Sequence, residues 1–419
     1  MNKNKNVVRN VALTGVLIGS SSAALATGFR LPDQDAFATG RGEAFVATAD
    51  NPSAIYYNPA GISQLEGQNL RGGIYGIYLD PMYTPDGSST TYHNQKKLAA
   101  VPQLFYTINP QDSMLSGGIG LYSPYGLAVD WPQKTGFRTV GFYGALTYIT
   151  LNPAVALKLS DNLSIGAGLT INYAKIDLRQ GIVWPTQNND GVKFGGDGWS
   201  AGYNLGGLWK INDHFSLGAT FHSGTKTDLK GHVSDRNTVA LPGFPTFRER
   251  SAASATLPTP LNAAFGISYR PTEHWNFEFD ADYTGWNTLT TVMIHQESAS
   301  AVLPQNIPLT FDWQPSWYYE FGGTRYFDNG WHVSAGYIFN ENAMPDAHYT
   351  PLVADEDRHF LSLGVGHKGK KFNFDVAYQF GFAADRKVTG SGTSPAGQTA
   401  DGTYNFISHA VIGSVGMNF

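Results

Sequence analysis

The histidine, serine and acidic side chains that could perform catalysis are scattered along this chain. Its 419 residues include 11 His and 33 Asp and Glu, and no two histidines stand at the H-x-x-x-H spacing that binds zinc on a helix. We also expect no G-x-S-x-G nucleophile elbow of the hydrolase type. The sequence therefore predicts no catalytic residue, no cofactor and no metal site. The first alternative to a protein without catalytic activity is an outer-membrane hydrolase, with a Ser-His or Asp-His site at the rim of a barrel.

Acidic side chains instead stand at alternate positions of an otherwise apolar segment. From Trp275 to Tyr283 the odd positions are aromatic or small, and the even positions are Asn276, Glu278, Asp280 and Asp282. A period of two residues is typical of a β-strand with one polar and one apolar face. The same period recurs at 163–173 and 371–382. We expect the polar face to line a crowded lumen and the aromatic face to meet lipid.

The strand pattern alone also fits a soluble β-sandwich or a solenoid, whose strands alternate in the same way. Two further features favour a membrane barrel. The alternating segments are about ten residues long, as a tilted membrane crossing requires, whereas soluble strands are usually nearer five or six. The connections between them also come in two sizes, short turns and long loops.

The N-terminus predicts export. Lys3, Lys5 and Arg9 precede an apolar stretch from 11 to 18, and small residues lead to Ala24-Leu25-Ala26. This is the pattern of a secretory signal peptide with an A-x-A cleavage site, and the apolar stretch is too short for a membrane-spanning helix. We expect a signal peptide over 1–26 and a mature chain that begins near Thr27.

Composition supports the same class. The chain has 48 Gly, 25 Phe, 22 Tyr and 9 Trp, only 15% charged residues and no Cys, and its mean hydropathy is −0.23. An exported chain without cysteine must hold its fold by packing and hydrogen bonds, without disulfides. The formal net charge is −5, without a clustered basic surface of the nucleic-acid-binding type, so we expect no nucleic-acid partner.

Turn residues predict the strand count. Short polar turns separate alternating strands at 109–110, 160–162, 212–213, 271–273, 328–330 and 369–370. Longer segments, at 80–98, 123–140, 179–198, 229–259, 287–315, 341–358 and 383–403, separate the hairpins from one another and from one strand at each end. Six hairpins and two end strands make fourteen, an even number, as bacterial single-chain barrels require. We expect an all-β fold, a 14-stranded antiparallel transmembrane β-barrel with short periplasmic turns and long outer loops.

Residues 27–68 lack sustained strand alternation and contain Asn51-Pro52 and Asn58-Pro59, which favour turns and short helices. A barrel of fourteen strands has a lumen too wide for its own side chains to fill. We therefore expect a signal peptide at 1–26, an N-terminal hatch at 27–68 that plugs the lumen, and the barrel at 69–419. The last strand ends on Phe419, which resembles the assembly signal of outer-membrane barrels.

Several short motifs, in order along the mature chain, resemble the FadL-type transporters of fatty acids and other hydrophobic compounds. They are Thr27-Gly28-Phe29, Asn58-Pro59-Ala60, the segments 122–127, 151–156 and 163–169, Tyr283-Thr284-Gly285-Trp286, and 355–364. The resemblance covers essentially the whole mature chain. It implies a fourteen-stranded barrel with an N-terminal hatch, in the bacterial outer membrane, that acts as a monomer in contact with outer-membrane lipid.

The resemblance also implies residue roles. Asn58, Pro59 and Ala60 would form the hatch motif, and Gly117, Gly118 and Gly120 would lie in a kinked third strand beside a lateral gap. Glycine permits such a kink, although barrel strands carry many glycines. Arg179 lies within one residue of a pocket arginine that would bind a carboxylate. A lumen ion pair is the alternative for Arg179 and the favoured role for Arg358.

The sequence thus predicts uptake of hydrophobic small molecules, first of all long-chain fatty acids, captured by outer loops with Trp184, Phe244, Phe247 and Trp313. A second basic residue expected from the family is absent from 312–316, which leaves neutral aromatic hydrocarbons as an alternative ligand class. The barrel pattern is also compatible with a general diffusion porin, which would pass ions freely, and with a structural or adhesin barrel.

Overall fold

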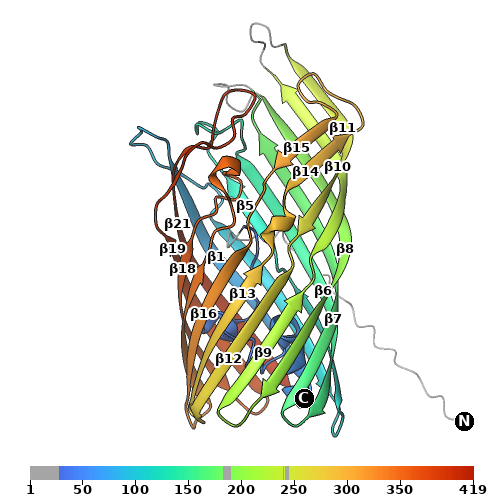
Figure 1. Cartoon of the computed structure of the whole chain (residues 1–419), viewed down its shortest axis with the longest axis vertical. Coiled ribbons are helices and arrows are strands. Elements are labelled where there is room, and N and C mark those ends of the chain that lie inside the picture. Colours follow the sequence, from blue (N-terminus) through green and yellow to red (C-terminus); the bar gives the residue numbers. More distant parts are fainter. Residues whose placement is uncertain (1–27, 183–189, 239, 241–244) are drawn as a thin grey trace, which may run out of the picture.

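In the described part of the chain, twenty-one β-strands form one sheet that closes on itself, as the computed structural model shows (Figure 1). The structure describes residues 28–182, 190–238, 240 and 245–419. The predicted signal peptide, 1–26, lies outside the described residues. No helix in the described ranges is long and apolar enough to cross a membrane.

Among the described residues, three short helical segments precede the barrel and two more interrupt it: α1 (Ala36–Gly40), α2 (Ala54–Tyr57), η1 (Pro59–Gln64), η2 (Trp286–Thr288) and η3 (Asp346–His348). The strands are β1 (Gly67–Thr84), β2 (Tyr92–His93), β3 (Leu98–Asn109), β4 (Leu115–Tyr122), β5 (Gly126–Asp130), β6 (Tyr143–Ser160), β7 (Leu163–Gln180), β8 (Asp190–Lys210), β9 (Phe215–His222), β10 (Thr225–Asn237), β11 (Phe247–Thr259), β12 (Asn262–Thr272), β13 (Trp275–Thr284), β14 (Thr291–Gln296), β15 (Asn306–Thr310), β16 (Ser316–Tyr326), β17 (Trp331–Asn340), β18 (Arg358–Lys368), β19 (Phe372–Ala383), β20 (Arg386–Val388) and β21 (Gly402–Asn418).

The wall has fourteen positions, as the sequence predicts. Five positions consist of two consecutive strands each: β4 with β5, β9 with β10, β11 with β12, β13 with β14, and β15 with β16. β2 and β20 are short and extend outer loops. The antiparallel pairing of β1 with β21, from Asn69↔Asn418 to Thr84↔Thr403, closes the barrel.

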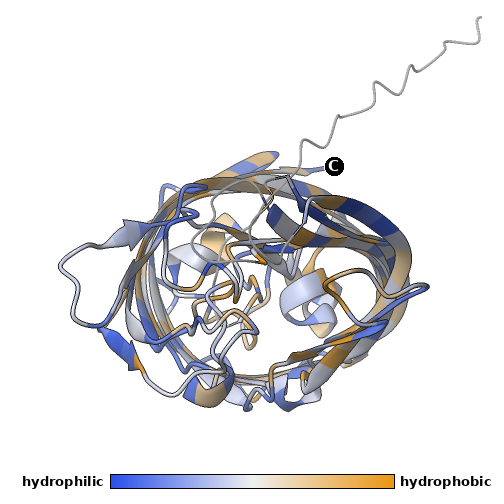
Figure 2. Cartoon of the chain, turned by 90° about the horizontal axis from the view of Figure 1, so that it is seen from above, coloured by the Kyte–Doolittle hydropathy of each residue, from blue (hydrophilic) through white to orange (hydrophobic). Residues whose placement is uncertain are grey.

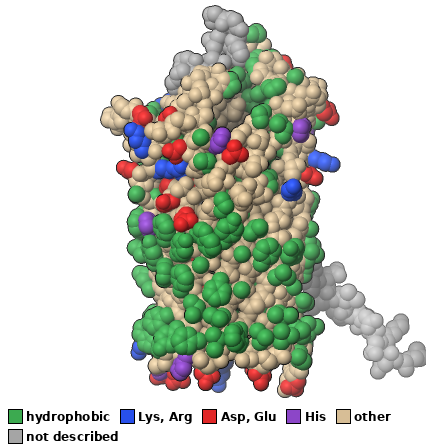
Figure 3. Space-filling view, viewed as in Figure 1, with side chains coloured by type: hydrophobic (Ala, Val, Ile, Leu, Met, Phe, Trp, Pro, Cys, Tyr) green, Lys and Arg blue, Asp and Glu red, His purple; other side chains and the backbone are tan. Residues whose placement is uncertain are grey.

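The polar faces of the strands point into the barrel and the apolar faces point outward, as expected. On β13, Asp280 is completely buried inside the barrel, whereas Phe277 is 45% exposed on the outside. The outward apolar side chains gather into a belt around the lower part of the barrel, with charged residues below and above it (Figure 3). This belt is the surface that a bilayer would cover.

Two expected loops are largely strand. The segment 229–259 contains most of β10 and β11, and 287–315 contains β14 and β15. Above the apolar belt the outward positions become polar, such as Lys230 and Arg236 on β10, whereas the inward Leu229 and Val233 are buried, so the pattern of apolar outside and polar inside no longer marks the strands. Main-chain hydrogen bonds do not depend on that alternation, and the pairing therefore continues (Figure 1).

The described residues before β1, 28–66, lie inside the barrel (Figure 2). We call residues 28–66 the hatch. Its helical segments are short, as its prolines and glycines predict, and they pack a small apolar cluster, including Phe45 and Ile55, against Phe105 and Tyr122 of the wall. The hatch therefore fills the lumen of the lower barrel, where the sequence predicts the plug.

Candidate functional site

The wall is interrupted in its third position. β4 ends at Tyr122 and β5 begins at Gly126. β3 pairs with β4 only up to Leu104↔Leu121, and within the described ranges β5 pairs with β6 but not with β3. The hydrogen-bonded wall is therefore open between β3 and β5 up to Asp130, whose carbonyl accepts the amide of Gln95 at 2.8 Å.

The start of the hatch, residues 28–31, lies along the free edge of β5, and we call it the N-terminal arm. The amide of Leu31 donates to the carbonyl of Pro124 at 2.8 Å, and the amide of Gly126 donates to the carbonyl of Phe29 at 2.8 Å. The arm thus supplies the main-chain partner that β3 does not provide, and it borders the interruption from inside.

The predicted glycines precede the interruption. An ideal Cβ on Gly118 would lie 2.8 Å from Cδ1 of Ile55, and one on Gly120 would lie 3.1 Å from Cγ2 of the same residue. These two glycines therefore let the hatch approach β4 closely, while Gly117 faces away from it, with Ile108 as its neighbour at 3.8 Å. Their part in a lateral gap stays a prediction.

An aromatic cluster surrounds Phe29 of the arm. Its ring lies 4.8 Å from Trp286, 5.9 Å from Trp313 and 5.9 Å from Tyr125. Gly28 has a φ of +61°, and a Cβ there would lie 2.5 Å from the Trp313 ring. A residue other than glycine would be strained and would clash, so Gly28 allows the two tryptophans to enclose the arm.

A cavity of about 40 Å³ lies beside the arm. Its lining includes Arg30 and the rings of Tyr56, Tyr122, Tyr125 and Tyr148. A water molecule needs roughly 10–15 Å³ of such volume, so the closed cavity accommodates a few waters and no acyl chain. Binding of a larger apolar molecule requires the cavity to widen, and movement of the arm is the nearest way to widen it.

Arg30 is the cation of this cavity. Its Nη2 donates to Oδ2 of Asp282 at 2.6 Å and to Asn262 at 3.2 Å, and its Nη1 donates to Oγ1 of Thr284 at 3.0 Å. The guanidinium also lies 5.2 Å from the centre of the Tyr318 ring. Arg30 is 5% exposed, and its charge is compensated by Asp282.

The acidic row of β13 holds the floor of the hatch. Oδ2 of Asp280 accepts the amides of Phe45 and Val46, at 2.7 and 2.8 Å. Glu278 accepts the amides of Ala47 and Thr48, at 2.7 and 3.2 Å, and pairs with Arg41 at 3.1 Å. The inward carboxylates that the sequence shows thus bind main-chain donors of the hatch.

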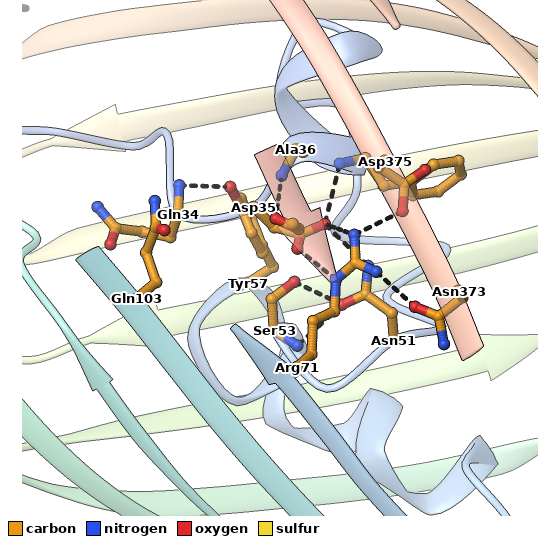
Figure 4. A network of polar contacts seen from close by, with 12 residues as sticks. Gln34, Asp35, Ala36, Asn51, Ser53, Tyr57, Arg71, Gln103, Asn373 and Asp375 are labelled. Atoms are coloured by element: carbon orange, nitrogen blue, oxygen red, sulfur yellow. Dashed lines mark hydrogen bonds and ion pairs between the residues drawn. The ribbon is translucent and has the colours of Figure 1, made fainter. Parts of the chain in front are cut away.

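A second attachment lies on the β1 and β19 side (Figure 4). Nε of Arg71 donates to Asp35 at 2.5 Å, and Nη2 donates to Asp375 at 2.7 Å. Asp35 also caps α1, accepting the amide of Phe37 at 3.0 Å, and His332 contacts Asp375 at 2.6 Å. Arg71 therefore links a hatch carboxylate to a wall carboxylate.

The Asn58-Pro59-Ala60 motif begins η1. Oδ1 of Asn58 accepts the amide of Ala60 at 3.2 Å, and Nδ2 donates to the carbonyls of Val46 at 2.8 Å and of Gly207 at 3.0 Å. A Cβ on Gly206 would lie 2.2 Å from Oδ1 of Asn58. Asn58 therefore closes the hatch on itself and joins it to β8 at a point where the wall has no side chain.

Two carboxyl groups of the hatch are buried close to one another. Burial raises the pKa of Asp33 to about 6, although Gln379 donates to it at 3.0 Å. Burial and the nearby Asp33 raise the pKa of Glu43 well above its ordinary value, and Tyr57 donates to Glu43 at 2.6 Å. This part of the hatch is therefore most stable when its carboxyl groups are protonated.

Below the hatch the barrel opens into a polar vestibule of about 990 Å³. Its lining comes from the end of the hatch, with Gln64, and from the short turns, with residues such as Asp112 and Asp161. A hydrophobic molecule that left the lumen downward would have to cross this polar space, which an apolar ligand avoids.

Arg179, the predicted pocket cation, does not line the cavity. Arg179 shares the outward face of β7 with Ile171 and Tyr173, and it pairs with Asp177 at 2.8 Å while stacking 4.2 Å from the Tyr143 ring. The prediction that Arg179 points into the lumen is wrong, because the period of two residues places the odd-numbered residues of β7 on the outside.

Arg358, in contrast, is completely buried, pairs with Glu356 at 3.1 Å and donates to the carbonyl of Ala354 at 2.7 Å. It forms the internal ion pair that the sequence favours.

The predicted capture residues do not form a groove among the described residues. Trp313 is 1% exposed, in the cluster around Phe29. Phe247 is half-buried at the start of β11. Trp184 and Phe244 lie outside the described residues.

One expectation about motifs needs correction. Gly198-Trp199-Ser200-Ala201-Gly202 matches G-x-S-x-G. These residues form the middle of β8, where Thr227 donates to Oγ of Ser200 at 2.9 Å. A nucleophile elbow needs a sharp strand-to-helix turn, so the match lacks the required geometry.

Arg30, Arg71 and His332 are residues of the site that the sequence does not single out. Each is a charged or titratable residue in an apolar or glycine-rich segment, which is the available signal, but each has a partner on a strand more than 40 positions away.

The chain matches one family over almost its whole length. The family profile described as outer membrane protein transport protein (OMPP1/FadL/TodX) covers residues 17–419. The long-chain fatty acid transport protein of Escherichia coli (strain K12) is 23% identical over 460 residues, with 99% of this chain and 98% of that protein covered. The 47 kDa outer membrane protein of Pasteurella multocida (strain Pm70) is 27% identical over 395 residues, with 88% of each covered.

Solved structures have the same architecture. A FadL homologue of Pseudomonas aeruginosa superposes with a TM-score of 0.83 at 20% identity, covering 94% of this chain and 100% of that one. The toluene transporter TodX of Pseudomonas putida superposes with a TM-score of 0.74 at 14% identity, covering 94% and 100%. At these identities the likeness shows the fold alone.

Proposed function

The chain belongs to the outer membrane transport protein family (OMPP1/FadL/TodX), and from this premise we propose that it takes up hydrophobic small molecules, first of all long-chain fatty acids. The observation that carries the proposal is the place of the N-terminal arm. It lies between an aromatic cavity and the interruption of the wall between β3 and β5. One small movement of the arm would both widen the cavity and uncover the lateral route.

Solvation explains why such a route is needed. Each buried methylene is worth roughly 0.8 kcal/mol, so an acyl chain of about fifteen methylenes disfavours a watery pore by about 12 kcal/mol. We propose that the ligand moves from the outer loops to the cavity and leaves sideways between β3 and β5. The hatch, held to β13 and to Arg71, blocks the direct path to the polar vestibule. The direction of transport follows from differences in ligand affinity between successive sites along this route.

Arg30 is the cation that we propose for a carboxylate. It replaces Arg179 in this role, because it lines the cavity and Arg179 does not. A guanidinium has five N–H donors, and Arg30 contacts the acceptors of the cavity wall through Nη1 and Nη2. A fatty-acid carboxylate could share Arg30 with Asp282.

Neutral aromatic hydrocarbons are the second ligand class. The observation in their favour is that Asp282 already compensates Arg30, at 2.6 Å, within a lining rich in tyrosine rings. Such a lining attracts an uncharged ring through edge-to-face and stacked contacts. TodX, the solved toluene transporter, is a structural relative, but the fold alone does not decide the ligand.

Native mass spectrometry of the detergent-purified protein separates the two classes. The protein is incubated with palmitate, oleate and naphthalene, and the retained ligand is identified. Retention of a fatty acid that Arg30→Gln reduces at least tenfold, and that Arg179→Gln does not change, would support fatty-acid uptake. Retention of naphthalene alone would assign the neutral class, and retention of none of the three would contradict the proposal.

We further propose that the protein acts as a monomer in outer-membrane lipid, with no covalent chemistry and no nucleic-acid partner. Hydrolysis of lipase or protease substrates by the refolded protein would contradict the absence of catalysis. Steady ion conductance of the purified protein in a planar bilayer would favour a general diffusion porin, and binding to cells or matrix without any apolar ligand would favour an adhesin.

A further inference from the structure

Seven cations point outward from four neighbouring strands of the upper wall. We call them the basic band: Lys175 and Arg179 on β7, Lys193 on β8, Lys230 and Arg236 on β10, and Arg248 and Arg250 on β11. Strand register brings them together. Arg179 is opposite Lys193, Ser234 lies between Lys193 and Arg250, and Arg236 is opposite Arg248.

Carboxylates of the same face do not balance this charge. Asp177, Asp197 and Asp228 face outward on these strands, and Glu297 lies beside β11, next to Ala252. Arg179 and Lys193 share one carboxylate, Asp177, each at 2.8 Å. Lys230, Arg236, Arg248 and Arg250 form no ion pair within the described parts of the chain.

The excess of positive charge is local. The whole chain carries a net charge of −5, and the neighbouring segments 183–189 and 238–246 contain no Asp or Glu. Like charges directly opposite one another destabilise an antiparallel pair, and Arg236 and Arg248 are such a pair. An external anion would remove this repulsion.

The height of the band on the wall indicates which anion it meets. Tyr173 and Trp199 are opposite one another at the upper edge of the apolar belt, where aromatic residues mark the membrane interface. Lys175 is two residues beyond Tyr173 and Arg179 is six, about 7 and 20 Å along the strand at about 3.3 Å per residue. Charged side chains stand above the apolar belt on this flank in Figure 3. The band therefore begins at the level of the lipid headgroups.

We propose that the basic band binds the phosphate groups of phosphorylated glycolipid in the outer leaflet of the outer membrane. Arginine forms paired hydrogen bonds with phosphate oxygens, and lysine supplies further charge. The cations are spread over the outer face of the wall from the edge of the apolar belt upward and do not converge on a pocket, which fits several headgroups side by side and not one small anion.

Lipid retention by the full-length purified protein tests the proposal. The probe is bisphosphorylated lipid A, titrated into the detergent-solubilised protein and followed by native mass spectrometry. Each cation near an anionic surface contributes about 1 kcal/mol, so the triple variant Lys175→Gln, Lys193→Gln, Lys230→Gln, which includes the two band cations nearest Tyr173 and Trp199, should bind about 100-fold more weakly. The matched control, Lys368→Gln, Lys370→Gln, Lys371→Gln, removes three cations from the turn at the other end of the barrel and should bind normally.

Three outcomes would overturn the proposal. They are unchanged lipid A binding by the Gln triple variant, equal binding of dephosphorylated lipid A, and binding of inorganic pyrophosphate as tight as that of lipid A. The triple variant with Arg at the same three positions should retain most of the affinity, because it keeps the charge. β-sheet circular dichroism verifies that each variant is folded, and fatty-acid retention should be the same in all of them.

Discussion

Two of the attachments between the hatch and the barrel differ in chemistry. On one side the carboxylates of β13 accept main-chain amides of residues 45–48. On the other side Arg71 bridges the carboxylates of Asp35 and Asp375 (Figure 4). The first attachment depends on an acceptor oxygen at the right place, and the second depends on a charge.

This difference indicates which attachment a single substitution can release. A buried ion pair that loses one partner leaves an uncompensated charge, which is strongly destabilising. A main-chain amide needs only a hydrogen-bond acceptor, charged or neutral. We therefore expect the Arg71 side to be sensitive to charge and the Asp280 contact of the β13 side, which accepts main-chain amides, to be tolerant of it.

The largest effect is expected from Arg71→Ala. The substitution leaves Asp35 and Asp375 buried without their cation, and it should destabilise the attached hatch by about 3–5 kcal/mol. Ion conductance in planar bilayers should rise, because the plug loosens. Arg325→Ala is the control, since Arg325 stacks 4.9 Å from Trp275 on the outer face. Conductance equal to that of the wild type would show that Arg71 does not hold the hatch.

A pair of substitutions at Asp280 tests the other side. Asp280→Ala removes the acceptor of two buried amides and should cost about 1–3 kcal/mol, whereas Asp280→Asn keeps a carbonyl oxygen and should cost less than about 1 kcal/mol. Hydrogen exchange at Phe45 and Val46 reports the difference directly. Equal acceleration of exchange in both variants would mean that the charge of Asp280, and not its oxygen, holds the hatch.

Two neighbouring glycines of β8 test the close approach between hatch and wall. A Cβ on Gly206 would meet Asn58 at 2.2 Å, and one on Gly207 would meet no atom within 4 Å. Gly206→Ala should therefore lower the unfolding free energy in detergent by about 1–2 kcal/mol, and Gly207→Ala should leave it unchanged. Equal midpoints of denaturant unfolding in the two variants would show that the close contact with Asn58 does not stabilise the hatch.

The smallest effect is a dependence on pH. The folded-state pKa values of Asp33 (about 6) and Glu43 are raised by burial, so protonation favours the packed hatch. This stabilisation is complete below the ordinary pKa near 4 and is lost as pH rises through about 6. Exchange of α1 amides, corrected for its intrinsic pH dependence, should be slower at pH 5 than at pH 8. The double variant Asp33→Asn, Glu43→Gln should flatten this difference, and an unchanged slope would exclude these two groups as its source.

The two attachments are not equally visible in the sequence. The acidic row of β13 follows from alternation alone, because Glu278, Asp280 and Asp282 occupy every second position of an apolar segment. The Arg71 attachment cannot be predicted from the sequence, because Asp35, Arg71 and Asp375 are separated by up to 340 positions and no periodicity links them. The same difference explains why the sequence does not single out Arg30 and why it predicts Arg179 in the lumen. A shift of one residue in a strand exchanges the inner and outer faces.

The sequence by itself determined the class of fold, the number of wall positions and the identity of the plug, because a barrel wall is built from local alternation and short turns. It predicted Asn58-Pro59-Ala60 through resemblance, and the contacts of Asn58 with Val46 and Gly207 became visible only in three dimensions. The tertiary structure decided where β5 leaves β3, which cation lines the cavity and which cations share the outer wall. These features depend on strand register and on contacts between distant segments, which no local pattern encodes.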